Sequence, residues 1–204
     1  MKSATVAVAL LTAAVSALIL LGGQLEEAAL RFGFIAARVG GMTLDGALPL
    51  WLTPWSATLV HGGWIHLLLN LVMLLWVGSQ VERVLGPANL LFAYLVGAIV
   101  AAGAQWLADP AAFTPMIGAS GAISAIFGIY ALFEARPKAV TRSLRLNRAI
   151  HVAWLLAAWV AIQWMNGVLS QGQGVMLATA AHIGGFVAGL AMQRPLLLWH
   201  YRRA

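Results

Sequence analysis

Six apolar segments dominate this sequence, each about as long as a membrane-spanning helix. A helix needs roughly 20 predominantly apolar residues to cross the hydrocarbon core of a bilayer. Segments of this kind lie at about 4–22, 59–79, 87–108, 116–134, 149–168 and 175–193. The 204 residues are 62% hydrophobic and only 9% charged, which is too little charge to cover the surface of a soluble domain of this size. We therefore predict an all-α polytopic membrane protein, a bundle of six transmembrane helices that forms one domain over residues 1–204.

The positions of the basic residues predict the orientation of the bundle. Six spans put both termini on one side, and ten of the twelve lysines and arginines fall on that side: Lys2, Arg83, Arg136, Lys138, Arg142, Arg145, Arg148, Arg194, Arg202 and Arg203. Lysine and arginine are enriched in cytoplasmic loops. We therefore expect both termini to be cytoplasmic and the protein to lie in a bacterial inner or plasma membrane. The same distribution explains the net charge of +6 without a nucleic-acid partner.

Turn-forming and charged residues mark the expected ends of the segments. Pairs such as Asp109–Pro110, Asn166–Gly167 and Arg194–Pro195 predict helix ends. The run from Glu82 to Pro87 predicts a tight link between the second and third helices. The longest connection, residues 23–58, carries charges and tryptophans that suit a segment lying in the membrane interface.

Ser120 and His182 lie inside apolar segments. Ser120 stands in Gly-Ala-Ser-Gly (118–121) and His182 in Ala-His-Ile-Gly-Gly (181–185). The predicted topology places both in the outer part of the membrane. Placing a polar side chain in hydrocarbon costs free energy, so polar side chains that are found there commonly serve a function. A serine nucleophile beside a histidine base predicts a hydrolase that works inside the bilayer.

The fourth segment offers two starting points for its helix. From Ser120 to Phe133 it holds 14 residues, roughly 21 Å of helix, which is shorter than the roughly 30 Å hydrocarbon core. Either the helix starts earlier, near Pro115, or it begins below the membrane surface at Ser120. In the second case, free backbone N–H groups at the helix start favour a developing negative charge beside Ser120.

Two further patterns point to the same region, each with a purely structural alternative. His66 and Asn70 share a helix face at i and i+4 and both donate hydrogen bonds, so they suit an oxyanion hole or an interhelical hydrogen-bond pair. Small residues recur at a spacing of four in two segments: Ser120, Ser124 and Gly128 in one, Ala181, Gly185 and Gly189 in the other. Such stripes let membrane helices approach closely, whether or not they serve a site.

Other chemistries fit the sequence less well. No carboxylate lies near His182 in sequence, so a Ser-His dyad is a simpler prediction than a triad. The chain has no cysteine, which excludes disulfides and thiolate chemistry. Haem or metal ligation by His61, His66 and His182 is disfavoured by their spacing and by the missing carboxylate. A transporter would need ionisable groups toward the inner face, where the segments are apolar. We expect no cofactor and no metal.

These motifs resemble those of the rhomboid family of intramembrane serine proteases. The resemblance lies in residues 61–70 (HGGWIHLLLN), 118–121 (GASG) and 181–185 (AHIGG), which are similar to the family's HxxxxHxxxN, GxSG and AHxxG elements in the same order. It covers roughly residues 45–193, which we expect to form the rhomboid-like core of the domain.

The resemblance implies a role for each matching residue. Ser120 would be the nucleophile and His182 its general base. His66, Asn70 and the Ser120 backbone N–H would form the oxyanion hole, while His61 would support them by hydrogen bonding. Many bacterial members carry tyrosine where this chain has Ser124, so the orientation of His182 must come from packing beside Gly185, from a Ser124 hydrogen bond, or from another contact.

The resemblance also implies substrates and one alternative function. The expected partners are the lipid bilayer and single-span transmembrane proteins, which would be cleaved near the outer face of the membrane. The alternative is a catalytically inactive rhomboid-like protein that binds membrane clients. Some relatives of that kind lack the serine or the histidine, whereas both are present here.

Overall fold

The computed structural model describes residues 3–133, 140–169 and 178–202, and these ranges are mainly helical. The longer helices are α1 (Ala4–Leu21), α4 (Trp64–Met73), α5 (Ser79–Ala108), α6 (Ser120–Phe133), α7 (Leu144–Leu169) and α8 (Thr179–His200). Shorter elements between α1 and α4 are α2 (Leu25–Phe32), η1 (Ala36–Gly40), η2 (Leu50–Leu52), α3 (Thr53–Ser56) and η3 (Ala57–Leu59). A π-helical turn, η4 (Leu74–Gly78), joins α4 to α5. The predicted all-α class is confirmed.

The apolar helices support the prediction of an integral membrane protein. Three described stretches are long and apolar enough to cross a bilayer: α1, the run Trp64–Ala108, and Leu144–Met165 within α7. α6 is apolar but shorter. Large apolar side chains face outward on these helices, including Leu18 with 72% of its surface exposed and Leu68 with 60%. Lipid would cover such a surface. The count of six spans stays a prediction.

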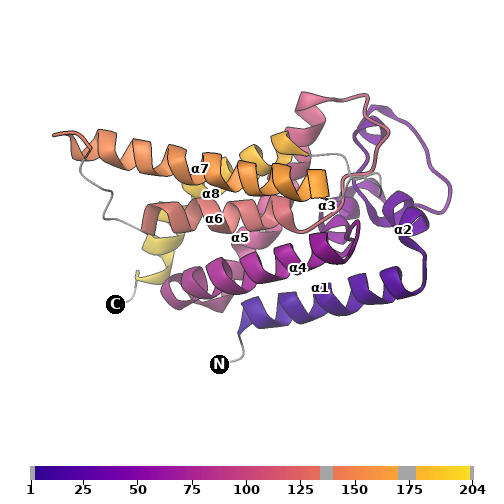
Figure 1. The fold of residues 1–204 in the computed structure, drawn as a ribbon, viewed down its shortest axis with the longest axis horizontal. Coiled ribbons are helices and arrows are strands. Elements are labelled where there is room, and N and C mark those ends of the chain that lie inside the picture. Colours follow the sequence, from indigo (N-terminus) through magenta and orange to yellow (C-terminus); the bar gives the residue numbers. More distant parts are fainter. Residues whose placement is uncertain (1–2, 134–139, 170–177, 203–204) are drawn as a thin grey trace.

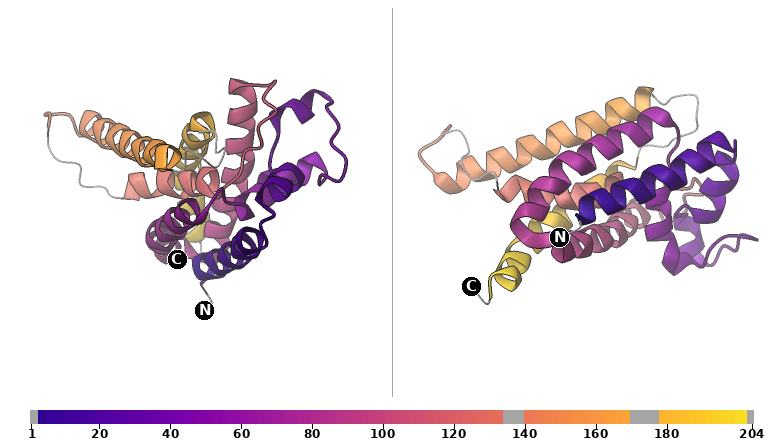
Figure 2. Two further views of the ribbon diagram at one scale, coloured as in Figure 1. Left: turned by 45° about the vertical axis from the view of Figure 1, so that its right-hand side comes forward. Right: turned by 90° about the horizontal axis from the view of Figure 1, so that it is seen from below.

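α6 lies at the centre of the bundle. Every residue from Ser120 to Ile129 is buried, and α5, α6 and α8 make the most extensive helix contacts. α7 packs over α6 and α8, while α1 lies on the opposite side of the bundle beside α4 and α5 (Figures 1 and 2). The first residue of α6 is therefore enclosed by elements from several parts of the chain.

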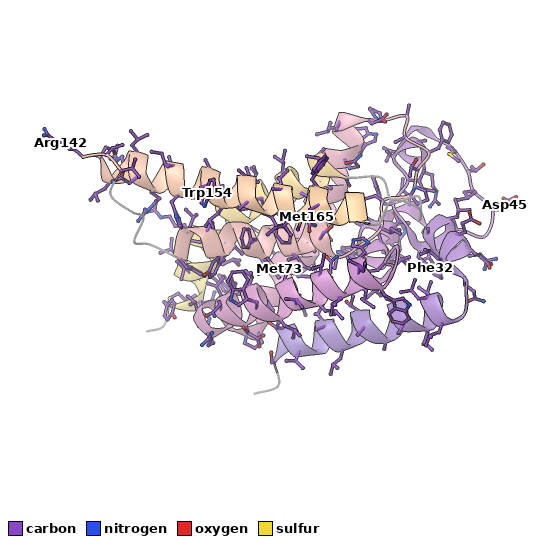
Figure 3. The ribbon with its side chains drawn as sticks, in the orientation of Figure 1. Phe32, Asp45, Met73, Arg142, Trp154 and Met165 are labelled. Carbon is purple, nitrogen blue, oxygen red and sulfur yellow. The ribbon has the colours of Figure 1, made fainter. Side chains whose placement is uncertain are left out.

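The long axis of the molecule separates a basic end from the long connection after α1. Figure 3 shows Arg142, just before α7, at one extremity and Asp45, in the connection between α1 and α4, at the other. The start of α1 and the end of α8 lie toward the Arg142 side (Figure 1). The start of α1, the end of α8 and Arg142 thus lie toward one end of the molecule, and the side of the membrane that this end faces stays a prediction.

The start of α6 settles the choice between its two predicted starting points. The helix begins at Ser120, and the residues before it run in extended and turn conformation. Met116 exchanges backbone hydrogen bonds with Phe34 at N···O distances of 2.8 and 3.0 Å. Pairing this segment with the first loop satisfies its backbone groups, so irregular backbone is tolerated inside the protein.

Several predicted helix ends differ from those observed. Helical structure continues through Glu82 and breaks only at Gly86, whose φ and ψ are 78° and 164°. α7 runs past Asn166–Gly167 to Leu169, because a weak helix former lowers helix stability by only about 1 kcal/mol. α8 continues through Pro195 to His200. The burial of Leu196 and a 3.0 Å hydrogen bond from the Tyr201 hydroxyl to the Val84 carbonyl offset the backbone bond that proline cannot make.

Glu82 has a structural role at the start of α1. Its carboxylate accepts hydrogen bonds from the Ser3 hydroxyl (2.9 Å) and from the backbone N–H groups of Ala4 (2.9 Å) and Thr5 (2.8 Å). A negative charge at a helix N-terminus satisfies free donors and complements the helix dipole. This contact joins α1 to α5.

Arg136, Lys138 and residues 175–177 of the predicted sixth segment lie outside the described residues.

Candidate active site

Ser120 and His182 meet in the interior of the bundle. Ser120 is the first residue of α6 and His182 lies in the first turn of α8. The Ser120 Oγ and the His182 Nε2 are 2.8 Å apart, and each residue is only 6% exposed. A hydroxyl that donates to a neutral imidazole at this distance has the geometry of a nucleophile and its base. Residues 62 positions apart are thus brought into direct contact.

Close packing of α6 against α8 produces this contact. A Cβ added to Gly185 would collide with the carbonyl oxygen of Gly121, and one added to Gly189 would collide with that of Ala125. In the other direction, a Cβ on Gly128 would collide with the carbonyl oxygen of Phe186. The two predicted small-residue stripes therefore do face each other. Each glycine removes the side chain that would otherwise hold the helices apart.

Gly118 and His66 form the wall of the site beside Ser120. Gly118 has a φ of 109°, in the left-handed region that favours glycine. A Cβ at this position would lie 2.7 Å from the His66 Cε1 and 2.8 Å from its Nε2. The Nδ1 of His66 accepts the backbone N–H of Gly62 at 3.2 Å. Neutral His66 therefore carries its proton on Nε2, the nitrogen that lies against Gly118.

Asn70 lies one helical turn after His66 and is buried with it. Its Nδ2 donates one hydrogen bond to the His66 carbonyl oxygen at 2.9 Å, which leaves the second N–H of the amide available. Asn70 is 3% exposed, and its Oδ1 has no hydrogen-bond partner among the described residues. The two predicted donors, His66 and Asn70, thus lie on the same face of α4, the helix beside the loop before Ser120.

His61 holds the loop before Ser120 through a chain of hydrogen bonds. Its Nε2 accepts the backbone N–H of Ala119 at 3.3 Å, so its proton lies on Nδ1, 2.9 Å from the Ser16 Oγ. The Ser16 hydroxyl in turn donates to the Leu59 carbonyl oxygen at 2.7 Å. His61 is fully buried. The supporting role implied by the sequence thus has a definite geometry that includes α1.

Ser124 does not orient His182 in the way that the sequence suggested as one option. Its hydroxyl donates to the Ser120 carbonyl oxygen at 2.7 Å, within α6. It also accepts the Trp159 Nε1–H of α7 at 2.7 Å. Ser124 therefore anchors α7, and its hydroxyl is already committed to a partner other than the imidazole.

Gln163 is a residue of the site that the sequence did not single out. Its side-chain Nε2 is 3.2 Å from the His182 Nε2, and the residue is 5% exposed. Gln163 follows Trp159 by four positions, so both lie on one face of α7. The available signal was a lone amide in the outer half of an apolar segment, which is equally compatible with a packing role.

Among the described residues, no carboxylate forms a hydrogen bond with the other nitrogen of His182. Its Nδ1 is buried without a hydrogen-bond partner among the described residues. Of the outer-side acids, Glu27 forms a 2.8 Å ion pair with Arg31 within α2. The contacts of His182 thus lie on its Nε2 side, with Ser120 and Gln163.

Comparisons with known proteins identify similarities over most of the chain. A family model for the rhomboid domain matches residues 50–199. The Rhomboid protease GlpG of Pectobacterium atrosepticum is 33% identical over 147 residues, which cover 71% of this chain and 48% of the relative. The protein of the same name from Yersinia pestis is 32% identical over 140 residues, covering 67% and 45% of the two chains. The chain therefore spans about half the length of these curated relatives.

Proposed function

From the premise that this chain belongs to the rhomboid family, we propose that it is an intramembrane serine protease. The observation that carries the proposal is the 2.8 Å contact between the Ser120 Oγ and the His182 Nε2 at the start of α6. Two relatives that bear the name rhomboid protease cover two thirds or more of the chain. Family membership and the contact support the same chemistry independently.

Ser120 is the nucleophile and His182 the general base in this proposal. The Ser120 oxygen attacks a peptide carbonyl while its proton passes to the His182 Nε2. The tetrahedral intermediate then expels the amine, which takes that proton from the imidazole. Water, deprotonated by His182, then attacks the resulting ester, and the imidazolium returns that proton to the Ser120 oxygen as the acid is released. A dyad without a carboxylate is supported by the Nδ1 of His182, which has no hydrogen-bond partner in the part of the chain that the structure describes.

The oxyanion is stabilised by three donors on two helices. These are the Nε2–H of His66, the free N–H of the Asn70 amide and the backbone N–H of Ser120. The first is supported by the tautomer that the Gly62 bond imposes on His66. The last is a free donor at the N-terminus of α6, where the helix dipole also favours negative charge. Donors fixed in place before the reaction are worth more than donors that must reorient.

The substrates are single-span transmembrane proteins that are cleaved near the outer face of a bacterial inner membrane. One observation and one prediction support this: Ser120 is buried inside an apolar bundle, and the distribution of basic residues predicts cytoplasmic termini. A helical substrate must unwind locally before Ser120 can attack, because a helix commits its carbonyls to internal hydrogen bonds. Binding partners therefore include the lipid bilayer as well as the substrate helix.

Covalent labelling of purified, folded protein with a fluorophosphonate probe tests this function. We expect the wild type to be labelled and the Ser120→Ala and His182→Ala variants to remain unlabelled with unchanged helical content. Cleavage of a reconstituted single-span substrate should be lost in the same two variants. A folded wild type that neither labels nor cleaves would refute the protease and favour client binding. Cleavage that persists in Ser120→Ala would refute the assignment of the nucleophile.

A further inference from the structure

Only contacts on one side of the ring define the hydrogen bonding of His182. Its Nδ1 has no partner among the described residues, whereas its Nε2 lies 2.8 Å from the Ser120 Oγ and 3.2 Å from the Gln163 Nε2. The ring of a histidine base is commonly held by a hydrogen bond to the nitrogen that does not react. No described residue provides that support, and the described hydrogen-bonding contacts that orient the ring are those at Nε2.

The amide of Gln163 selects one tautomer of the imidazole. An amide nitrogen donates hydrogen bonds but does not accept them. In the amide orientation found here, the Nε2 of His182 is the unprotonated nitrogen, as donation by the Ser120 hydroxyl also requires, and the proton of the neutral ring lies on Nδ1. In this tautomer the lone pair on Nε2 points toward both donors, and it is the lone pair that takes the proton of Ser120.

Glutamine also suits the protonated state of the base. Once Nε2 has gained a proton, it becomes a donor and needs an acceptor. Rotation of the Gln163 side-chain amide by half a turn replaces its N–H with its carbonyl oxygen at the same position. A single side chain thus bonds to the imidazole before proton transfer and to the imidazolium after it, whereas lysine could only donate and glutamate could only accept.

The rest of α7 keeps Gln163 at this position. Trp159, one turn earlier, is 1% exposed. It donates its Nε1–H to the Ser124 Oγ at 2.7 Å and packs on the ring of Phe127 with centroids 5.1 Å apart. Most neighbouring side chains on α7 are partly or fully exposed. Two polar contacts on one face, Trp159 with α6 and Gln163 with α8, thus fix the position of α7 against the site.

We infer that Gln163 is a positioning residue that orients His182 toward Ser120 and holds it in the reactive tautomer. This inference rests on the proposed protease function. It gives α7 a role in the reaction, although none of the recognisable sequence motifs lies on α7. Gln163 itself does not touch the reacting peptide in this mechanism and acts through His182 alone.

Two substitutions at Gln163 separate positioning from a purely structural role. Gln163→Met keeps the length and volume but removes both hydrogen-bonding atoms. We expect the rate of fluorophosphonate labelling and kcat to fall about 3- to 10-fold, the equivalent of one hydrogen bond, with KM unchanged.

Gln163→Glu places a negative charge beside His182 and favours its protonated form. We therefore expect the acid limb of the pH–rate profile to move to higher pH.

The pH profile must be read with the other groups around His182 in mind. The titratable side chains described around the site besides His182 are His61 and His66, and both are unaltered in both variants. Trp164→Phe, on the exposed face of α7, is the matched control and should label as the wild type does. A structural role for Gln163 would lower the amount of folded protein without moving the acid limb.

A measurement without turnover completes the test. In ¹⁵N-histidine spectra, with His182→Ala for assignment, we expect His182 to be the Nδ1–H tautomer in the wild type and a mixture in Gln163→Met. The inference about Gln163 would be overturned if Gln163→Met kept the wild-type labelling rate and spectra and the acid limb did not move in Gln163→Glu. The proposed protease function would not be affected by that result. A wild type that is never labelled would refute the protease function, and the spectra would still decide whether Gln163 orients the ring.

Discussion

Replacing Gly118 with alanine tests how closely the loop before α6 is fitted to His66. The added Cβ would lie 2.7 Å from the His66 Cε1, whereas carbon atoms in good contact are about 3.5–4.0 Å apart. Either the ring or the loop must therefore retreat by about 1 Å. The φ of 109° adds a second cost, because left-handed backbone destabilises a residue with a side chain by about 1–2 kcal/mol.

Gly41→Ala is the control that separates these two effects. Gly41 has a similar φ of 99°, yet a Cβ there would meet no atom within 4 Å. We expect Gly41→Ala to lose about 1–2 kcal/mol in the free energy of unfolding, measured in detergent micelles, and Gly118→Ala to lose more because of the added contact with His66. Only Gly118→Ala should also lose about 100-fold in labelling rate and kcat, because a displacement of about 1 Å at a reacting centre has that effect. The reasoning would be refuted if Gly118→Ala were labelled at the wild-type rate, or if Gly41→Ala lost as much labelling rate and kcat as Gly118→Ala.

Two further predictions concern the support of the site and its orientation in the membrane. Ser16→Ala removes the partner of the His61 Nδ1, so the free energy of unfolding should fall by about 1–3 kcal/mol and labelling should slow; an unchanged thermal midpoint would argue against the hydrogen-bond chain. Since the chain has no cysteine, single Asp45→Cys and Arg142→Cys variants report topology directly. In intact cells a membrane-impermeant maleimide should modify Asp45→Cys and spare Arg142→Cys, and the reverse pattern would invert the proposed orientation.

The sequence predicted the contact between α6 and α8 because short-range patterns determine it. The small residues at a spacing of four mark the face on which each helix is packed, and Gly185 and Gly189 are indeed in contact with α6. Counting spans also predicted similar depths for Ser120 and His182, and the 2.8 Å contact between them agrees with that similarity. The sequence alone allows two start positions for α6. The contact that decides between them is the pairing of Met116 with Phe34, and no sequence periodicity relates these two loops.

Gln163 escaped prediction for a different physical reason. In water, an apolar stripe on a helix shows which face is buried. α7 is apolar around most of its circumference. Its outer face contacts lipid and its inner face contacts protein, and apolar side chains suit both environments. Its rotation about its own axis was therefore not readable from hydropathy. Tertiary contacts with α6 and α8 fix that rotation, and they alone show that Gln163 faces inward while Trp154 is 70% exposed (Figure 3).

The serine at position 124 and the glutamine at position 163 form parts of one arrangement. A small side chain at Ser124 leaves room for the Trp159 indole, whose Nε1–H then finds the Ser124 hydroxyl at 2.7 Å. Anchoring Trp159 against α6 fixes the face of α7 that points inward, and one turn further along this face is Gln163. The amide then reaches the His182 Nε2. Ser124 thus contributes to the site through Trp159 and Gln163 rather than by a contact of its own with the imidazole.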